Sequence, residues 1–315
     1  MPVVAVCLNP AVDRVVVAPC AAGGGTIRAA RVLDTAGGKA THAALVASRF
    51  GADVHLVGPL GGQRGLLFAA LLRGIGLRVS SVPVGGETRE TWTVVDPEVG
   101  DVLELIGPAP RLSPDEVEAL RVLTVAVLAS ATDTLLAGSA PEGVGPELYA
   151  EIVAHARGRG GRILLDASGD ALRAGLAARP HVACPNLEEA CAVLGATPPE
   201  EPSAASMLEV AAGTQELGAE SVVITAGERG ALVLSADGEA WHAAAPRRRR
   251  VNAVGCGDAF LGALAAALAE GRPLPEAARL ATGAAVDKLG RIHPAEVDPA
   301  AARALAREVE LRRIR

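Results

Sequence analysis

Aromatic residues are scarce in this chain: three Phe, two Trp and one Tyr make up 2% of its 315 residues. Proteins that stack bases against side chains need such rings, and few are available here. Positive charge is also not in excess, because 36 acidic residues outnumber 30 basic ones and the net charge is −6. A protein that coats nucleic acid carries a basic footprint instead. We therefore expect no nucleic-acid partner.

Signals for membrane insertion, secretion and zinc binding are missing as well. No stretch of about 18 uncharged apolar residues appears, and the N-terminus enters an apolar strand pattern without the basic and apolar regions of a signal peptide. The five cysteines show neither CxxC nor Cys/His ligand spacing, so they indicate no zinc site and no disulfide framework. These cysteines are Cys7, Cys20, Cys184, Cys191 and Cys256. We expect a cytoplasmic protein that does not contact a membrane.

Half of the residues are hydrophobic, so the chain can bury a substantial core. Short apolar runs alternate with segments of helical periodicity, which is typical of a parallel sheet covered by helices on both faces. The expected strands are 3–8, 54–57, 134–137, 163–165, 181–184 and 221–225. The expected helices are 40–50, 64–73, 114–129, 146–157, 187–194, 207–217 and 259–270. We interpret residues 1–315 as a single domain.

Two segments interrupt this alternation, at about residues 14–35 and 86–107. The second predicts a hairpin, because apolar and polar residues alternate before the turn residues 96–100. Strands outside a parallel sheet often cover a site, and a small apolar flap leaves edges that a second copy can cover. We predict a small β-sheet lid and a homodimer formed through it. The dense basic run Arg247–Arg250 is interpreted as a solvated strand edge. The alternative is that these arginines contact a nucleotide, since they lie just upstream of a glycine turn.

The most informative motif is Gly255-Cys256-Gly257-Asp258, which precedes a helical stretch rich in Ala and Leu. Glycines allow backbone conformations closed to other residues, so N–H groups of this turn can converge on one point. The helix N-terminus adds partial positive charge at that point. An anion can be held there while the carboxylate of Asp258 removes a proton. The alternative is that Asp258 only caps the helix.

A second motif lies upstream, where Ala36-Gly37-Gly38-Lys39 opens another predicted helix. A cation at a helix N-terminus has the wrong sign for the macrodipole, so Lys39 indicates an anionic ligand nearby. The alternative is a solvated lysine behind a flexible loop. A third feature is Asp13, which follows the first predicted strand, where open α/β sheets place ligand-binding groups. A surface turn is the alternative for Asp13.

These motifs together resemble the PfkB/ribokinase family of carbohydrate kinases, and within it the branch of 1-phosphofructokinase and tagatose-6-phosphate kinase. The resemblance spans nearly the whole chain. It rests on the opening Leu8-Asn9-Pro10-Ala11-Val12-Asp13, on the two glycine motifs, and on shorter matches. The shorter matches are Thr88-Arg89, Gly138-Ser139, Leu165 to Gly169, Pro185-Asn186 with Glu189, and Thr225 with Gly227 and Gly230. It implies a ribokinase-like three-layer α/β/α sandwich with a mainly parallel central sheet and a β-sheet lid.

The resemblance also implies roles for individual residues. Asp258 falls on the catalytic base, and the amides of Gly255, Cys256 and Gly257 on the anion hole for the transferred phosphate. Asn186, Thr225, Gly227 and Gly230, with Gly257, fall on the ATP side, and Glu189 organises Mg²⁺ through water. Asp13, Gly37, Gly38, His42 and Ser139 belong to the acceptor side, where Lys39, Arg89 and Arg28 meet a phosphate already on the substrate. A monovalent cation such as K⁺ is a further option.

Departures from the family pattern cluster on the acceptor side. His42 stands where the branch has an asparagine that binds sugar hydroxyls, and Ile106 stands where another asparagine is usual. The expected function is ATP-dependent phosphoryl transfer to a hydroxymethyl group of a phosphorylated ketohexose: fructose 1-phosphate, fructose 6-phosphate or tagatose 6-phosphate. A kinase of an unphosphorylated sugar or nucleoside is one alternative. A non-catalytic sugar-phosphate binder is the other.

Overall fold

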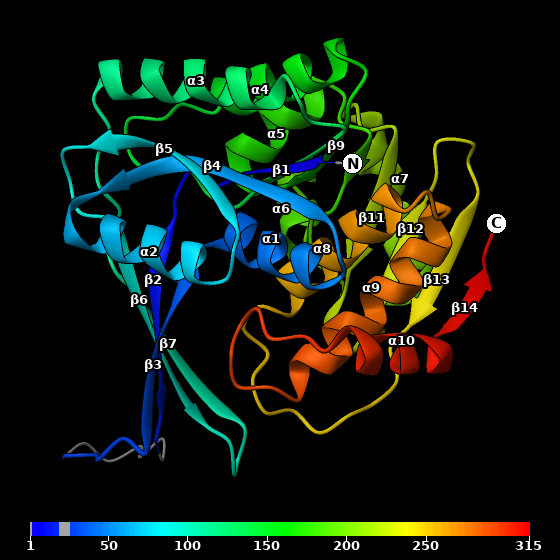
Figure 1. The fold of residues 1–315 in the computed structure, drawn as a ribbon. Helices are drawn as coiled ribbons and strands as arrows, with labels where there is room; N and C mark the ends of the chain where they lie inside the picture. The colour runs from blue at the N-terminus through cyan, green and yellow to red at the C-terminus, as the bar shows by residue number, and fades with distance from the viewer. Residues whose placement is uncertain (1, 19–25) are drawn as a thin grey trace.

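The computed structural model describes residues 2–18 and 26–315, which form a large mainly parallel sheet between two layers of helices and a small separate sheet (Figure 1). The strand order of the large sheet is β14-β13-β12-β11-β10-β9-β8-β1-β4-β5. The expected α/β class and mainly parallel sheet are therefore confirmed. No helix in the described ranges combines the length and the apolar character needed to span a bilayer.

The parallel strands come from the apolar runs of the sequence, since strands covered on both faces are apolar throughout. They are β1 (Pro2–Val6), β4 (Asp53–Gly61), β5 (Arg78–Val84), β8 (Asp133–Ala137), β9 (Arg162–Asp166), β10 (Val182–Ala183) and β11 (Ser221–Thr225). An antiparallel extension follows at one edge, formed by β12 (Ala231–Leu234), β13 (Ala240–Ala244) and β14 (Glu310–Arg313). The sequence patterns did not predict β5 or this extension.

Two helical layers give the protein one hydrophobic core on each face of the large sheet. One layer contains α1 (Lys39–Arg49), α2 (Gly62–Gly74), α8 (Cys256–Ala269), α9 (Leu274–Leu289) and α10 (Pro299–Glu308). The other contains α3 (Pro114–Leu128), α4 (Glu147–Gly158), α5 (Gly169–Ala177), α6 (Leu187–Leu194) and α7 (Ala204–Glu216). The short helix η1 (Gly227–Arg229) follows β11. The predicted helices are present with small shifts at their ends, whereas α5, α9 and α10 were not predicted.

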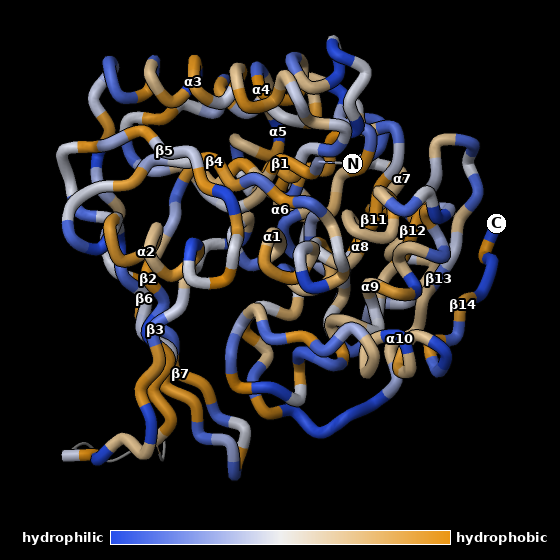
Figure 2. Tube along the Cα trace, in the orientation of Figure 1, coloured by the Kyte–Doolittle hydropathy of each residue, from blue (hydrophilic) through white to orange (hydrophobic). Residues whose placement is uncertain are grey.

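The small sheet, here called the lid sheet, has the strand order β3-β2-β6-β7 and extends away from the helical layers (Figure 1). Its strands are β2 (Ala11–Val17), β3 (Arg31–Gly37), β6 (Arg89–Asp96) and β7 (Asp101–Ile106). The predicted hairpin is the antiparallel pair β6 and β7. Residues 19–25 of the first predicted lid segment lie outside the described residues. Hydrophobic stretches run along the lid strands (Figure 2).

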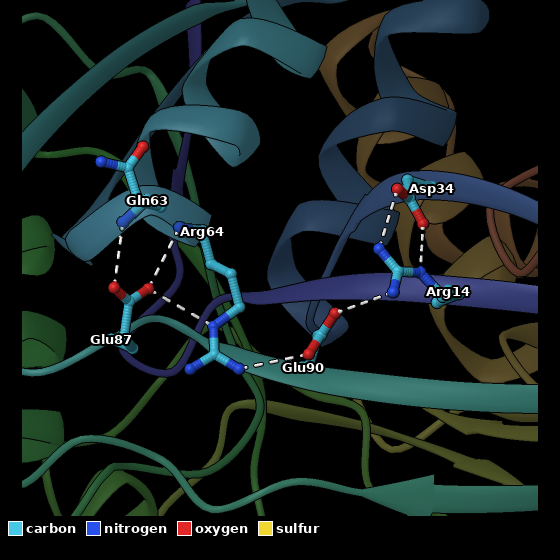
Figure 3. Close-up of polar contacts among 6 residues, drawn as sticks. All are labelled: Arg14, Asp34, Gln63, Arg64, Glu87 and Glu90. Carbon is cyan, nitrogen blue, oxygen red and sulfur yellow. Dashed lines mark hydrogen bonds and ion pairs between the residues drawn. The ribbon is translucent and has the colours of Figure 1, made fainter.

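A chain of charged contacts joins the lid sheet to α2 (Figure 3). Glu87 accepts hydrogen bonds from the N–H groups of Gln63 and Arg64 and so caps the N-terminus of α2. The Arg64 guanidinium contacts Glu90 of β6 at 3.2 Å, and Glu90 in turn lies 3.5 Å from Arg14 of β2. Arg14 also binds Asp34 across the β2–β3 pair, with an Nε to Oδ1 distance of 2.8 Å. These pairs fix the base of the lid sheet against the large domain.

The basic run Arg247–Arg250 is a loop between β13 and α8, so the prediction of a strand edge is wrong. Its arginines are exposed, as expected, but two of them bind the tip of the β6–β7 hairpin. The Arg249 guanidinium donates to the carbonyl oxygens of Pro97 and Glu98, and Arg250 donates to that of Gly100. The loop thus supports the far end of the lid sheet by bonds to its backbone.

Candidate active site

A cavity of about 460 Å³ lies where the lid sheet meets the carboxyl ends of the parallel strands. Its wall combines residues from the lid strands, from the first turns of α1 and α8, and from the segments after β8 and β9. Ligands of open α/β sheets bind at this edge because strand ends and helix N-termini converge there. The volume suits a small-molecule ligand.

The first turn of α8 supplies the cavity with a backbone cradle. Gly255 has φ 85°, and a Cβ at this position would collide with the Pro294 carbonyl, so only glycine fits. The N–H of Cys256 donates to the Ala253 carbonyl at 3.2 Å, whereas those of Gly255 and Gly257 make no hydrogen bond to any described residue. A Cβ on Gly257 would meet no atom within 4 Å. The cradle therefore has free donors and open space for an anion.

Asp258 lies in the same turn and is 8% exposed. Its Oδ2 atom is 2.8 Å from Nδ1 of His42 in α1. The other ring nitrogen of His42, Nε2, is 2.8 Å from Oδ2 of Asp13 in β2. This second contact is an ion pair rather than a well-aligned hydrogen bond, because Nε2 has no hydrogen-bond partner of good geometry. One buried imidazole thus lies between two carboxylates.

The charge of His42 follows from these neighbours. Burial by itself would lower the pKa of His42, but Asp13 and Asp258 outweigh it and raise the pKa to about 10. Each carboxylate favours the charged imidazolium, and the ring in turn compensates both negative charges. At neutral pH the ring is therefore protonated on both nitrogens.

Lys39 forms a second charged cluster on the other side of the cavity. Its Nζ atom is 3.0 Å from Oε1 of Glu189 and 3.6 Å from Oδ1 of Asp166. Burial opposes the ammonium charge, but these two carboxylates raise the pKa of Lys39 above its usual range. Burial also raises the pKa of Asp166, to about 7, although Lys39 counteracts the shift. The amine of Lys39 thus contacts two carboxylates of the cavity, one of which is the predicted metal residue Glu189.

Asn186 and Glu189 begin α6 with a reciprocal capping box. The Asn186 Oδ1 accepts from the Glu189 N–H at 2.8 Å, and the Glu189 Oε2 accepts from the Asn186 N–H at 3.0 Å. Asn186 also forms a parallel bridge with Thr225 at the end of β11. The described residues contain no group of three or more His, Cys, Asp or Glu arranged to hold a metal. A hydrated Mg²⁺ that binds through water fits Glu189, because such an ion needs only one or two protein carboxylates.

Arg89, which was predicted from the sequence for the acceptor side, lines the cavity. It donates from Nη2 to the Asn9 carbonyl at 3.1 Å, while its buried Nε atom has no partner. A buried donor without a partner is costly, so this guanidinium is prepared for an anionic ligand. Ser139 also lines the cavity and accepts a hydrogen bond from the Asn9 amide at 3.2 Å.

Asp13 is held in place by close backbone approach as well as by hydrogen bonding. A Cβ on Gly37 would collide with the Asp13 carboxyl group, which explains the glycine there. The Oδ1 of Asp13 accepts a hydrogen bond from Thr91 of β6. Gly38, with φ 100°, then turns the chain into α1.

Five predicted site residues do not line the cavity, namely Arg28, Gly37, Gly227, Gly230 and Cys256. Arg28 is exposed at the lid, and Gly227 and Gly230 belong to the turn around η1, next to Thr225. A Cβ on Gly230 would collide with the Ala243 carbonyl, so this glycine is explained by the β12–β13 packing. Residues that sequence reasoning did not assign include Asp166 and Glu104. Burial raises the pKa of the Glu104 carboxyl, which lines the cavity from β7.

A buried cation that the sequence did not single out lies behind the cradle. Lys288 of α9 is fully buried, and its Nζ atom donates to the carbonyl oxygens of Asn252 at 2.8 Å and Arg291 at 3.3 Å. Burial lowers its pKa to about 8. The ammonium therefore adds positive charge to the segment that leads into the cradle.

Comparisons with known proteins agree with this geometry. The sequence profile described as pfkB family carbohydrate kinase matches residues 6–296. A 1-phosphofructokinase of Rhodobacter capsulatus is 36% identical over 308 residues, which are 98% of this chain and 96% of that protein. A 1-phosphofructokinase of Xanthomonas campestris is 32% identical and covers 95% of this chain and 96% of its own length.

Solved structures show the same fold at lower identity. A possible 1-phosphofructokinase from Thermotoga maritima superposes with a TM-score of 0.88 at 20% identity, covering 100% of both chains. Phosphofructokinase-2 from Escherichia coli, in complex with potassium, gives a TM-score of 0.87 at 23% identity over 98% of both chains. The three-layer arrangement with a small separate sheet is thus common to these proteins.

Proposed function

This chain belongs to the pfkB family of carbohydrate kinases, and we propose that within the family it phosphorylates a ketohexose phosphate at the expense of ATP. Membership of this family supports a phosphotransferase that acts on a sugar hydroxyl. The observation that carries the finer proposal is that Asp258, the open cradle at Gly257 and Arg89, whose buried Nε atom has no partner, line one cavity. A base, an anion cradle and a cation for the acceptor phosphate are the parts that this reaction needs.

The reaction proceeds by attack of the acceptor hydroxymethyl oxygen on the γ-phosphorus. A new O–P bond forms, the bond from the γ-phosphorus to the bridging oxygen breaks, and ADP leaves with that electron pair. Asp258 accepts the hydroxyl proton. The free N–H groups of Gly255 and Gly257 stabilise the charge on the migrating phosphoryl group, helped by the N-terminus of α8.

Mg²⁺ supplies charge neutralisation to the phosphates when it is bound. Glu189 would hold it through water, and the carboxylate of Glu189 is fixed by the capping box and by Lys39. The Lys39 ammonium lies on this side of the cavity, where it balances Glu189 and Asp166. Asn186 and Thr225, joined by a backbone bridge, form the adjoining wall for ATP.

Fructose 1-phosphate is the acceptor we place first, since the two most similar relatives above are named 1-phosphofructokinases. Arg89 supports a phosphorylated acceptor, because its buried Nε needs a partner. The second candidate is an unphosphorylated sugar. It is favoured by Glu104, whose carboxylate lines the acceptor side and would repel a phosphate unless protonated.

A homodimer through the lid sheet accompanies this proposal. Exposed hydrophobic side chains lie on the lid strands, with 54% exposure at Leu103, 52% at Leu105 and 51% at Val32. Exposed apolar side chains gathered on one small sheet suit burial by a second copy. Dependence on K⁺ is a separate question, because Lys288 already places one positive charge near the cradle. It is tested by comparing the rate of turnover in a potassium salt with the rate in a salt of a bulky organic cation.

The deciding experiment measures ADP release from ATP with fructose 1-phosphate, fructose 6-phosphate, tagatose 6-phosphate, ribose and fructose. Turnover with a phosphorylated ketohexose is expected, and D258N should reduce kcat by roughly 10²–10⁴-fold with nucleotide affinity unchanged. D237N, in an exposed turn outside the cavity, is the matched control. Turnover only with uncharged acceptors would favour the second candidate. No turnover with any of them would favour a sugar-phosphate binder that does not catalyse transfer.

A further inference from the structure

His42 is the residue whose position the proposed reaction does not yet explain. It is 5% exposed, lies in the first turn of α1, and touches both the base and an acceptor-side carboxylate. Asp258 belongs to α8 and Asp13 to β2 of the lid sheet, so the imidazole connects the large domain to the lid sheet at the reacting centre.

Close packing keeps this connection rigid. A Cβ on Gly262 of α8 would collide with the Ala43 carbonyl of α1, so the two helices are in direct contact next to His42 and one turn from Asp258. The carboxyl group of Asp13 is confined by Gly37 on one side and bonded to Thr91 on the other. Each partner of the imidazole is therefore fixed by its own element.

The contact with His42 determines which carboxylate oxygen of Asp258 can accept a proton from the substrate. The Oδ2 of Asp258 is bonded to Nδ1 of His42, so Oδ1 remains as the acceptor for a hydroxyl proton. The imidazole also keeps a positive charge between two carboxylates that would otherwise repel each other.

We propose that His42 positions the catalytic base: its imidazolium holds the Asp258 carboxylate with one oxygen turned toward the acceptor hydroxyl and ties it to Asp13. The proposal rests on the proposed function, in which Asp258 is the base. During transfer the hydroxyl proton ends on Oδ1 of Asp258, and His42 retains both of its own protons. His42 is thus a positioning residue and not a proton carrier.

Charged groups line the cavity around His42 from the lid strands, from α8 and from α1 itself. Asp13, Arg89 and Glu104 face it from the lid strands, Asp258 faces it from α8, and Lys39 precedes it by one turn on α1. The two carboxylates in direct contact dominate, since they raise the pKa of His42 to about 10 despite its burial. The imidazolium is therefore present across the pH range in which such an enzyme is assayed.

H42N tests the proposal, because the amide keeps a polar side chain but removes the charge. We expect kcat to fall about tenfold to hundredfold with the KM for ATP unchanged. The pH dependence of kcat should also differ from that of the wild-type protein, because H42N removes the cation that contacts Asp258. H55N is the matched control, because His55 lies in β4 outside the cavity and bonds Ser80. An H42N profile that superimposes on the wild-type profile, with kcat within about twofold, would overturn the proposal.

A second measurement needs no variant and so does not depend on folding of H42N. The chain has six histidines, and nitrogen NMR of the labelled wild-type protein reports the protonation of each ring. One ring should remain protonated on both nitrogens at pH 8.5, and its signals should shift in D258N. Complete deprotonation of all six rings by pH 8 would also overturn the proposal.

The two ideas fail in different ways. If the wild-type protein transfers phosphate to no acceptor, the proposed function fails and the kinetics of H42N cannot be measured. The NMR result still decides whether the imidazolium of His42 exists. If D258N abolishes turnover but H42N leaves the rate and the pH profile intact, the function stands and only the positioning role is refuted.

Discussion

Replacement of Gly257 by alanine separates the chemical role of the cradle from its structural role. Gly257 lies in the first turn of α8 with a negative φ, and the added Cβ would meet no protein atom within 4 Å. The methyl group would project into the open space of the cavity, where we place the migrating phosphoryl group. The protein itself therefore tolerates the change, but the ligand does not.

G257A should raise the stability of the protein and lower its activity. Alanine in a helix is favoured over glycine by about 0.5–1 kcal/mol, so G257A should unfold about 1–3 °C higher than the wild-type protein. Turnover should fall by about 10²-fold, comparable to the loss of one donor in an anion hole. G255A gives the reverse contrast in stability, because φ 85° and the nearby Pro294 carbonyl make it cost on the order of 1–3 kcal/mol.

Coupled ADP release and thermal unfolding measured on the same preparations check this prediction. G74A is the matched control, since Gly74 ends α2 with open space around it and lies outside the cavity. It should gain a little stability without losing activity. Full activity in G257A, or a loss of activity that merely follows a loss of stability, would refute the role of this turn as the phosphoryl cradle.

Three further predictions follow from the charges and surfaces described above. R89A should raise the KM for phosphorylated acceptors about tenfold or more with little effect on the KM for ATP, because it removes one charge-assisted contact; equal effects on both would exclude that contact. The pKa of His42 is raised above its unfolded value, so its stabilising contribution is complete below pH 6.5 and is lost as pH rises toward 10. Chemical unfolding should therefore show wild-type stability falling more steeply than that of H42N between pH 7 and 10, and parallel curves would contradict the ion pairs. L103E on the lid sheet should convert a dimer to a monomer, as measured by light scattering, whereas V122E at an exposed position of α3 should not. A monomeric wild-type protein would contradict the dimer prediction.

Much of the fold could be predicted because local patterns and the overall fold agree. The run Ser221–Thr225 is the strand β11, and Leu187–Leu194 is the helix α6, with the same bounds as expected. Both segments carry their signal locally, in a continuous apolar run or in a capping box followed by a glycine. The edge strand β14 lacked such a signal, because its pairing with β13 joins segments about 70 residues apart. Arg247–Arg250 was misassigned for a related reason, since its structure depends on the distant lid hairpin.

The sequence motifs indicated which residues line the cavity, but not which side chains contact one another there. The motifs brought Asp258, Lys39, Arg89 and Asn186 to one cavity, as the order of strand ends implies. The partners of these side chains could not be read from the motifs. Lys39 binds Glu189, 150 residues away, and Glu104 was not recognised because a single carboxylate on a predicted strand carries no distinguishing pattern.

The sequence by itself determined the alternation of strands and helices, the two glycine turns and the family, because each depends on residues close together in the chain or on motifs in a fixed order. Only the tertiary structure decided the electrostatics of the centre. His42 carries a charge because Asp13 and Asp258, which arrive from a lid strand and from a helix more than 200 residues apart in the chain, converge on one buried ring. Protonation depends on distance and burial, and neither is encoded by spacing along the chain.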